Sequence, residues 1–313
     1  MLSVVVPMYN EEAVLGQTLP RMRAALDALG MAYELICVDD GSADGTATLL
    51  RAARAGWPQV RIVRLRANAG HQAALTAGLD VATGDYVVTI DADLQDPPEL
   101  IGDMVATAMR EQVDVVYAVR ADRRADSAFK RGTAGMYYGL ARRVAGPQVP
   151  AHAGDFRLMS RAAVEALRSL PERHRVYRLL IPWLGFPSAT VTYTRSARAA
   201  GETKYPVSKM VRLATDSITS FTAAPLRLAT WLGAGGFAVC FVLGVASVIA
   251  YFAGATVPGW ASITVALLFM GAVQLLCLGL LGEYVGRLYA ETQRRPLYFV
   301  AEDSGSGLPA ARR

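Results

Sequence analysis

Two carboxylates separated by one residue, Asp91 and Asp93, are the strongest chemical signal in the sequence, and Gln95 adds an amide oxygen. Such oxygens suit a hard divalent cation, and Mg²⁺ or Mn²⁺ is often shared between one or two carboxylates and substrate phosphates. An Asp-x-Asp alone also occurs as a turn or helix cap, and Asp96-Pro97-Pro98-Glu99 is typical of a helix start. Acidic residues also follow two other predicted strands, at Glu11-Glu12 and Asp39-Asp40, and this placement favours a site for a metal and a nucleotide diphosphate.

The elements that would position these residues alternate over the first 120 residues. The predicted strands are Leu2–Val6, Glu34–Val38, Arg61–Leu65, Tyr86–Ile90 and Val113–Val119, and the predicted helices are Glu11–Leu29, Asp44–Ala55, His71–Val81 and Pro97–Arg110. This series predicts an α/β fold with a mostly parallel sheet covered by helices. Ligands of such sheets bind beyond the carboxyl ends of the strands. No Gly-x-Gly-x-x-Gly follows the first strand, so a dinucleotide site is not expected.

Composition divides the chain into a polar part and an apolar part. The sequence is 53% hydrophobic and 19% charged, against about 45–50% and about 25% in average globular proteins. This apolar content excludes a disordered chain, and 28 Gly and 3 Cys exclude collagen-like and disulfide-dense classes. No Asp, Glu, Lys or Arg lies between Arg227 and Glu283. The sequence therefore predicts a polar domain followed by a membrane anchor.

The uncharged segment predicts two membrane spans, Leu228–Ala253 and Ala261–Gly282, since about 20 apolar residues cross a bilayer. Arginines flank the pair on both sides while the connecting turn is uncharged, so the positive-inside rule predicts a hairpin with both ends in the cytoplasm. The N-terminus does not have the pattern of a signal peptide, so we expect the polar domain to remain cytoplasmic. The alternative is two buried core helices of a soluble protein.

Three motifs resemble those of family 2 glycosyltransferases of the GT-A fold, more narrowly the dolichyl-phosphate mannose synthase-like branch. They are Val4–Glu11, Val38–Ser42 and Asp91–Glu99. Gly282–Glu291, followed by Arg295-Pro296, resembles the C-terminal signature of bacterial polyprenyl-phosphate (bactoprenol) glycosyltransferases with two membrane helices. The resemblance covers about residues 2–300. It implies a nucleotide-diphosphate sugar as donor and a polyprenyl phosphate as acceptor.

The resemblance also implies a donor site. Pro7, Tyr9, Glu11, Val38 and Asp40 would line the nucleobase and ribose, whereas Asp91, Ala92, Asp93 and Gln95 would hold the metal and diphosphate, with Arg120 as a diphosphate-binding arginine. Elementary chemistry agrees, because Asp40 can accept a hydrogen bond from a base and Tyr9 offers a stacking face. Glu11 has an alternative interpretation as an acid favoured in the first turn of a helix.

Basic residues are predicted to meet the acceptor phosphate. Arg131, Arg198 and Lys204 are the candidates, and Arg198–Tyr205 resembles the family's Arg-x-x-Gly-x-Ser/Thr-Lys-Tyr loop. Charge runs are more often solvated faces, which remains the alternative for Arg123, Arg124, Arg142 and Arg143. The expected catalytic set is Asp93, Asp155, Arg198 and Lys204.

Asp155 is expected to orient the acceptor rather than to remove a proton. A phosphate monoester has its second pKa near 6, so the nucleophile is already largely a dianion at neutral pH. The alternative is a structural pair between Asp155 and Arg157. His71, His152 and His174 have no metal-binding spacing and are interpreted as local hydrogen-bonding residues.

The predicted organisation has four parts: a GT-A domain over 1–205, a juxtamembrane amphipathic helix over 206–227, a two-helix hairpin over 228–282 and a cytoplasmic tail over 283–313. The expected activity is metal-dependent, inverting transfer from a UDP-hexose such as UDP-glucose to undecaprenyl phosphate at the inner (cytoplasmic) membrane. Expected partners are membrane lipids and, from relatives, a homotetramer, but no nucleic acid. The alternatives are a processive polysaccharide synthase, whose Gln-x-x-Arg-Trp motif is absent, and a non-catalytic membrane scaffold.

Overall fold

A computed structural model describes residues 1–120, 153–172, 175–194, 224–253 and 259–305. The chain forms two compact units, one that contains strands β1 to β8 and one that contains helices α9 and α10. The chain leaves the first unit before α9 and returns to it after α10, because β8 follows both helices in the sequence. The hairpin is therefore inserted into the sequence of the first unit.

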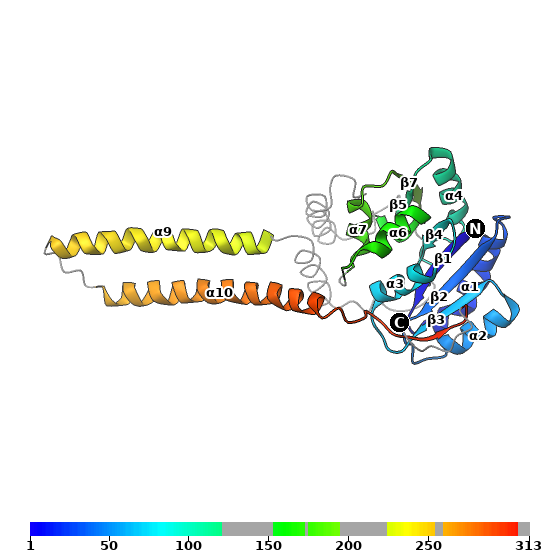
Figure 1. Cartoon of the computed structure of the whole chain (residues 1–313), viewed down its shortest axis with the longest axis horizontal. Coiled ribbons are helices and arrows are strands. Elements are labelled where there is room, and N and C mark those ends of the chain that lie inside the picture. Colours follow the sequence, from blue (N-terminus) through cyan, green and yellow to red (C-terminus); the bar gives the residue numbers. More distant parts are fainter. Residues whose placement is uncertain (121–152, 173–174, 195–223, 254–258, 306–313) are drawn as a thin grey trace. The chain divides into compact units, whose positions relative to one another are not determined.

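The first unit is built on one eight-stranded sheet with the order β7-β5-β6-β4-β1-β2-β3-β8 (Figure 1). The strands are β1 Leu2–Met8, β2 Tyr33–Asp39, β3 Val60–Leu65, β4 Tyr86–Thr89, β5 Val115–Arg120, β6 Ala153–Ser160, β7 Ser188–Tyr193 and β8 Val300–Asp303. β6 and β8 run antiparallel to their neighbours, and the other pairings are parallel. The predicted mostly parallel α/β sheet is confirmed.

Helices cover both faces of this sheet. They are α1 Glu12–Asp27, α2 Thr46–Gly56, α3 His71–Val81, α4 Leu100–Glu111, α6 Arg161–Ser169 and α7 Tyr177–Trp183. α1, α2 and α4 pack on one face, and α3, α6 and α7 pack on the other. β1 is buried along its whole length, as expected of a central parallel strand. α3 approaches this strand closely, because a Cβ on Gly78 would lie 2.2 Å from Val5 Cγ1.

The strand ends define the edge where a ligand can bind. The carboxyl ends of β1, β2, β4 and β5 lie at one edge of the sheet because these strands are parallel, and antiparallel β6 starts at that edge. Asp39, Asp91, Arg120 and Asp155 are thereby brought to the same edge, although they are far apart in the sequence.

β8 was not predicted and adds the last strand of the sheet. It pairs with β3 and is itself the edge strand on that side of the sheet. Arg51 Nη2 lies 2.5 Å from Glu302 Oε2, and Arg61 Nη2 lies 2.8 Å from Asp303 Oδ2. Just before β8, the Tyr298 hydroxyl donates to Asp80 Oδ2 at 2.7 Å. Part of the predicted C-terminal tail therefore belongs to the sheet of the first unit.

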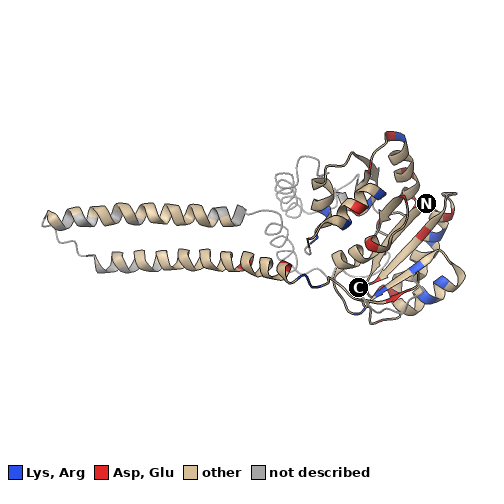
Figure 2. Ribbon diagram, in the orientation of Figure 1, with Lys and Arg blue, Asp and Glu red and all other residues tan. Residues whose placement is uncertain are grey.

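The second unit is an antiparallel pair of long apolar helices, α9 Ala224–Phe252 and α10 Trp260–Thr292 (Figure 1). No Asp, Glu, Lys or Arg lies in the described part of this pair between Arg227 and Glu283, and Figure 2 shows charged residues in the final part of α10. Trp231, Leu275 and Phe252 are 75, 72 and 82% exposed. Both helices are long and apolar enough to cross a membrane, as predicted.

Candidate active site

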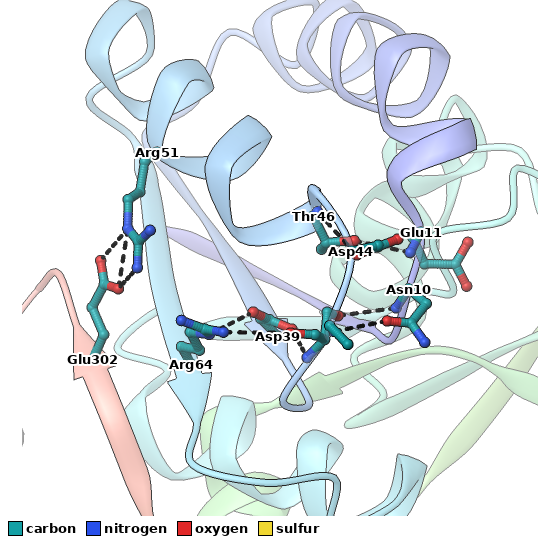
Figure 3. A network of polar contacts seen from close by, with 10 residues as sticks. Asn10, Glu11, Asp39, Asp44, Thr46, Arg51, Arg64 and Glu302 are labelled. Carbon is teal, nitrogen blue, oxygen red and sulfur yellow. Dashed lines mark hydrogen bonds and ion pairs between the residues drawn. The ribbon is translucent and has the colours of Figure 1, made fainter.

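The first part of the site is a polar network at the carboxyl ends of β1 and β2 (Figure 3). Asp39 is fully buried, and its Oδ2 lies 3.1 Å from Arg64 Nε on β3. Its Oδ1 accepts from the backbone N–H of Ser42 at 2.8 Å, and the Ser42 hydroxyl accepts from the N–H of Asn10 at 2.9 Å. Asn10 Oδ1 in turn accepts from the N–H of Ala43 at 3.0 Å. The network fixes the two loops on which the predicted nucleobase residues lie.

Asp40 has a structural task at the same edge. Its carboxylate is 3% exposed and accepts from the backbone N–H groups of Ala69 and Gly70 at 2.7 and 2.9 Å. Burial raises the pKa of Asp40, and these two hydrogen bonds oppose the shift. Gly41 follows with φ +70°, and a Cβ there would lie 2.6 Å from the Ala67 carbonyl carbon. Asp40 and Gly41 therefore hold the loop before α3 against the end of β2.

The other predicted nucleobase residues differ in what they present. Tyr9 is 47% exposed, so its ring is accessible for stacking. Pro7 and Val38 are register partners in β1 and β2, and the Val38 side chain is fully buried. Val38 as a whole residue is 0% exposed, so it offers no accessible surface to a ligand in this structure. Glu11 immediately precedes α1, and its N–H donates to Thr46 Oγ1 at 3.0 Å. Its carboxylate points away from the Asp44–Thr46 contacts in Figure 3.

The second part of the site is the loop after β4, which carries the predicted metal ligands. Leu94 adopts φ 56°, a left-handed conformation that turns the chain between Asp93 and Gln95. Asp93 Oδ1 accepts from the N–H of Gln95 at 3.1 Å. Ala92 is buried, and its carbonyl accepts from Thr18 Oγ1 of α1 at 2.8 Å. The loop is therefore anchored to α1, and Ala92 contributes backbone rather than an exposed side chain.

The donor set of this loop suits a cation that completes its coordination with substrate oxygens. Gln95 is 8% exposed, and its Oε1 has no hydrogen-bond partner among the described residues. A buried carbonyl oxygen without a partner costs about 1–3 kcal/mol, and ligation is one way to satisfy it. Within the described ranges no three His, Cys, Asp or Glu side chains form a metal cluster. Asp91, Asp93 and Gln95 thus fit Mg²⁺ or Mn²⁺ shared with a diphosphate better than a closed protein site.

The third part of the site is an ionic cluster around Asp155, near the start of β6. Asp155 Oδ1 lies 2.5 Å from Nη2 of Arg157, which is 2% exposed. Asp155 Oδ2 lies 3.4 Å from Arg178 Nη2 and 3.6 Å from His71 Nε2. His71 Nε2 is also 3.8 Å from Asp91 Oδ1. The cluster therefore joins β6, α7, the first residue of α3 and the loop after β4.

The environment moves the pKa values of this cluster in opposite directions. Burial tends to raise the pKa of Asp155, but His71, Arg157 and Arg178 outweigh it and hold the pKa well below its usual range. Burial raises the pKa of Asp91 to about 6, assisted by other carboxylates and opposed by His71. Burial tends to lower the pKa of His71, yet the neighbouring carboxylates raise it overall. Asp155 is thus a firmly ionised group and a weak proton acceptor.

Arg120 lies at the end of β5, beside this cluster. Its Nε is 3.4 Å from the Tyr193 hydroxyl, which also donates to Asp96 Oδ1. Burial raises the pKa of Tyr193 to about 12, and Asp96 adds to the shift. A Cβ on Gly154 would lie 3.8 Å from Arg120 Nη2. Arg120 is therefore placed between the loop after β4 and the start of β6.

Not every predicted site residue is placed. Arg131, Arg198 and Lys204 lie outside the described residues, as do His152, His174 and 206–223 of the predicted amphipathic helix. The structure adds two residues that the motifs did not indicate, Arg178 and Arg64. Neither lies in a recognisable motif, and each reaches the site only through the packing of its element. His71, interpreted from the sequence as a local hydrogen-bonding residue, lies within the site, 3.6 Å from Asp155 Oδ2 and 3.8 Å from Asp91 Oδ1.

Comparison with known proteins gives the family. Residues 3–168 match the family described as Glycosyl transferase family 2, and residues 224–288 match the GtrB C-terminal hairpin. The uncharacterized glycosyltransferase YkcC of Bacillus subtilis (strain 168) is 42% identical over 307 residues, which cover 97% of this chain and 94% of that protein. The prophage bactoprenol glucosyl transferase homolog of Escherichia coli (strain K12) is 37% identical over 300 residues, covering 96% of this chain and 98% of that protein.

Among solved structures, glucosyl-3-phosphoglycerate synthase from Mycobacterium tuberculosis, in complex with Mn²⁺, UDP and glucosyl-3-phosphoglycerate, matches with a TM-score of 0.49. The two are 24% identical, and the match covers 69% of this chain and 76% of that one. The α/β sheet and the sequence matches together define a transferase of the GT-A class. The chain belongs to glycosyl transferase family 2, and it carries the GtrB-type C-terminal hairpin. The family predicted from the three motifs is confirmed.

Proposed function

We propose that the protein transfers one hexose, glucose in the first instance, from a UDP-hexose to undecaprenyl phosphate. The observation that carries this proposal is the similarity along 96% of the chain to a protein named as a bactoprenol glucosyl transferase homolog. The site adds chemical support, because acids suited to a shared cation lie beside a cationic cluster at one edge of the sheet. Bactoprenol is a polyprenol, and the apolar hairpin suits an enzyme whose acceptor has a membrane-embedded tail.

The proposed reaction is a single displacement. An oxygen of the acceptor phosphate attacks C1 of the sugar, the bond between C1 and the diphosphate oxygen breaks, and UDP leaves with the electron pair. One displacement inverts the configuration at C1. The attacking phosphate is largely a dianion at neutral pH, so no side chain has to remove a proton from it.

Residues of the chain would bind and orient the reactants. Asp91, Asp93 and Gln95 would hold Mg²⁺ or Mn²⁺, which when bound neutralises charge on the diphosphate. Arg120 would contact the diphosphate from the end of β5, and Tyr9 would stack on the base. Arg131, Arg198 and Lys204 would bind the acceptor phosphate. Asp155 is ionised and held by Arg157, so it would position groups around it.

The proposed location is the cytoplasmic leaflet of the inner membrane, with α9 and α10 as the two spans. Both helices have the length and composition of spans. A homotetramer is the proposed assembly. The juxtamembrane helix over 206–227 would keep the acceptor phosphate near the headgroups, although only its last residues, which begin α9, lie among the described residues.

A screen of nucleotide sugars tests the function. The purified full-length protein is incubated with undecaprenyl phosphate, Mg²⁺ or Mn²⁺ and one nucleotide sugar at a time, and the lipid is analysed by mass spectrometry. We expect addition of a single hexose from a UDP-hexose, loss of product with a chelator, and a β-linked product from an α-linked donor. Repeated sugar addition would indicate a polysaccharide synthase, and absence of transfer and of donor hydrolysis would indicate a scaffold.

A further inference from the structure

The Asp155 cluster has two layers that differ in accessibility. The Arg157 side chain is 2% exposed and that of Asp155 is 16% exposed, so both lie beneath the surface of the site. The Arg178 and His71 side chains are 36 and 39% exposed. Both approach the same oxygen, Asp155 Oδ2, at 3.4 and 3.6 Å. The buried Asp155–Arg157 pair thus orients two more accessible side chains, those of Arg178 and His71.

The groups that surround the Asp155 carboxylate, which are two guanidiniums and one imidazole, favour binding of an anion. Asp155 carries one negative charge, whereas Arg157 and Arg178 are two permanent cations. Asp155 contacts both arginines, Arg157 at 2.5 Å and Arg178 at 3.4 Å, so two guanidinium groups share one carboxylate. His71 is the first residue of α3, where the helix dipole adds a partial positive charge. His71 Nε2 lies 3.8 Å from Asp91 Oδ1, which places these groups next to the loop after β4.

We propose that Arg178 and His71 form a binding site for phosphoryl oxygens and that Asp155 is the positioning residue that orients them. The proposal rests on the function proposed above and adds two contacts to it. A guanidinium binds phosphate through parallel hydrogen bonds, and its geometry is useful only when the group is held in place. Asp155 holds it there while Arg157 keeps Asp155 ionised. The phosphoryl oxygens belong to the donor diphosphate or to the acceptor phosphate.

Binding measurements on the full-length protein test this site and distinguish the two sources. UDP with Mg²⁺ is titrated in one arm, and undecaprenyl phosphate in nanodiscs is titrated in the other. We expect Arg178→Gln to weaken binding of one ligand by about tenfold or more, with an unchanged thermal unfolding temperature. Weaker UDP binding assigns the site to the donor diphosphate, and weaker lipid binding with normal UDP binding assigns it to the acceptor.

Further variants separate ligand binding from a structural effect. Arg178→Lys should restore part of the lost affinity, and His71→Gln should weaken the same ligand as Arg178→Gln does. Arg110→Gln is the matched control, because its side chain is 68% exposed on α4, on the opposite face of the sheet. Asp155→Asn should raise KM for that ligand more than it lowers kcat, as expected of a positioning residue.

Two outcomes would overturn the proposal. One is unchanged affinity for both ligands in a folded Arg178→Gln protein. The other is a loss of affinity with a lower unfolding temperature that Arg178→Lys does not correct, since this would make Arg178 a structural residue. Absence of transfer by the unmodified protein would instead contradict the proposed function, and the binding arms would still report on this site.

Discussion

The buried amide of Gln95 lowers the stability of the folded protein, and we propose that it binds the cation. Its side chain is almost fully buried, and Oε1 lacks a hydrogen-bond partner within the described parts of the chain. A polar atom left in this state destabilises the folded protein by about 1–3 kcal/mol. A residue that serves only stability is expected to be apolar at such a position. Its presence two residues after Asp93 is consistent with ligation of the proposed cation.

Replacement of Gln95 should therefore separate stability from activity. Gln95→Met keeps the volume and removes the unsatisfied oxygen, so we expect an equal or higher unfolding temperature without metal. Transfer to lipid should fall by about tenfold or more, because a ligand of the cation is lost. Both are measured by thermal unfolding and by the mass-spectrometric assay. Gln59→Met is the control, since Gln59 is exposed. Full activity of Gln95→Met would remove this residue from the metal site.

The sequence predicted the contiguous part of the site and missed the part assembled by packing. Asp91, Asp93 and Gln95 lie in one loop, so a candidate metal site could be predicted from their spacing in the sequence. Arg178 lies on α7, and its contact with Asp155 depends on how α7 packs against β6. No local pattern carries that information. The Asp155–Arg157 pair, recognised as the alternative interpretation, is present together with the contacts to His71 and Arg178.

Among the elements, β8 adds two ion pairs to its backbone pairing with β3. Arg51 of α2 donates to Glu302, and this hydrogen bond is the main reason why the pKa of Glu302 is lowered. The two side chains are 49 and 33% exposed. A pair with this exposure contributes up to about 1 kcal/mol. Arg61 and Asp303 form a second and more buried pair next to it.

The lowered pKa of Glu302 gives a pH-dependent prediction. The folded state prefers ionised Glu302, so the stabilisation is present above the ordinary pKa of 4.5 and is lost as pH falls through the lower folded value. We expect Arg51→Gln to lower the unfolding free energy at pH 7 by about 0.5–1 kcal/mol. The difference from the unmodified protein should vanish in acid.

A double-mutant cycle with Glu302→Gln is the control for this pair. The double variant should be no less stable than either single variant at pH 7, because each removes the same interaction. A deficit of Arg51→Gln that persists unchanged in acid would show that the arginine acts through packing of its aliphatic stem instead.

Element prediction succeeded where the apolar pattern was continuous. β1 to β5 were predicted from short Val- and Ile-rich runs, and α3 was predicted with the bounds that it has. β6 was missed because Asp155 and Arg157 interrupt its apolar residues. β8 is four residues long and ends in two acids, which is not a strand pattern. It is placed in the sheet by backbone pairing with β3, and ion pairs with α2 and β3 accompany this pairing.

At the scale of the molecule, the order of elements restricts how the hairpin can cross a membrane. The chain leaves the first unit before α9 and rejoins its sheet through β8 after α10. If α9 and α10 cross a membrane, β8 can pair with β3 only when both ends of the hairpin lie on the same side, so the number of crossings must be even. Two apolar helices satisfy this condition. The same arrangement was inferred from the flanking arginines, so two independent arguments predict it.

This topology can be measured in cells. An epitope tag inserted within 254–258, between α9 and α10, should be accessible to a membrane-impermeant protease from outside the inner membrane of spheroplasts. A tag after residue 313 should be protected until the membrane is opened. Protection of both tags in intact spheroplasts, with the protein present in the membrane fraction, would contradict the two-span hairpin.

The position of β8 also has a consequence for biosynthesis. Synthesis proceeds from the N-terminus, and domains begin to fold while the chain is still growing. β3 is made early, but its partner β8 follows the hairpin in the sequence. Until the ribosome has made residues 300–303, one edge of β3 has unpaired backbone groups, which can pair with other chains. The first unit can therefore complete its sheet only after both apolar helices have been translated.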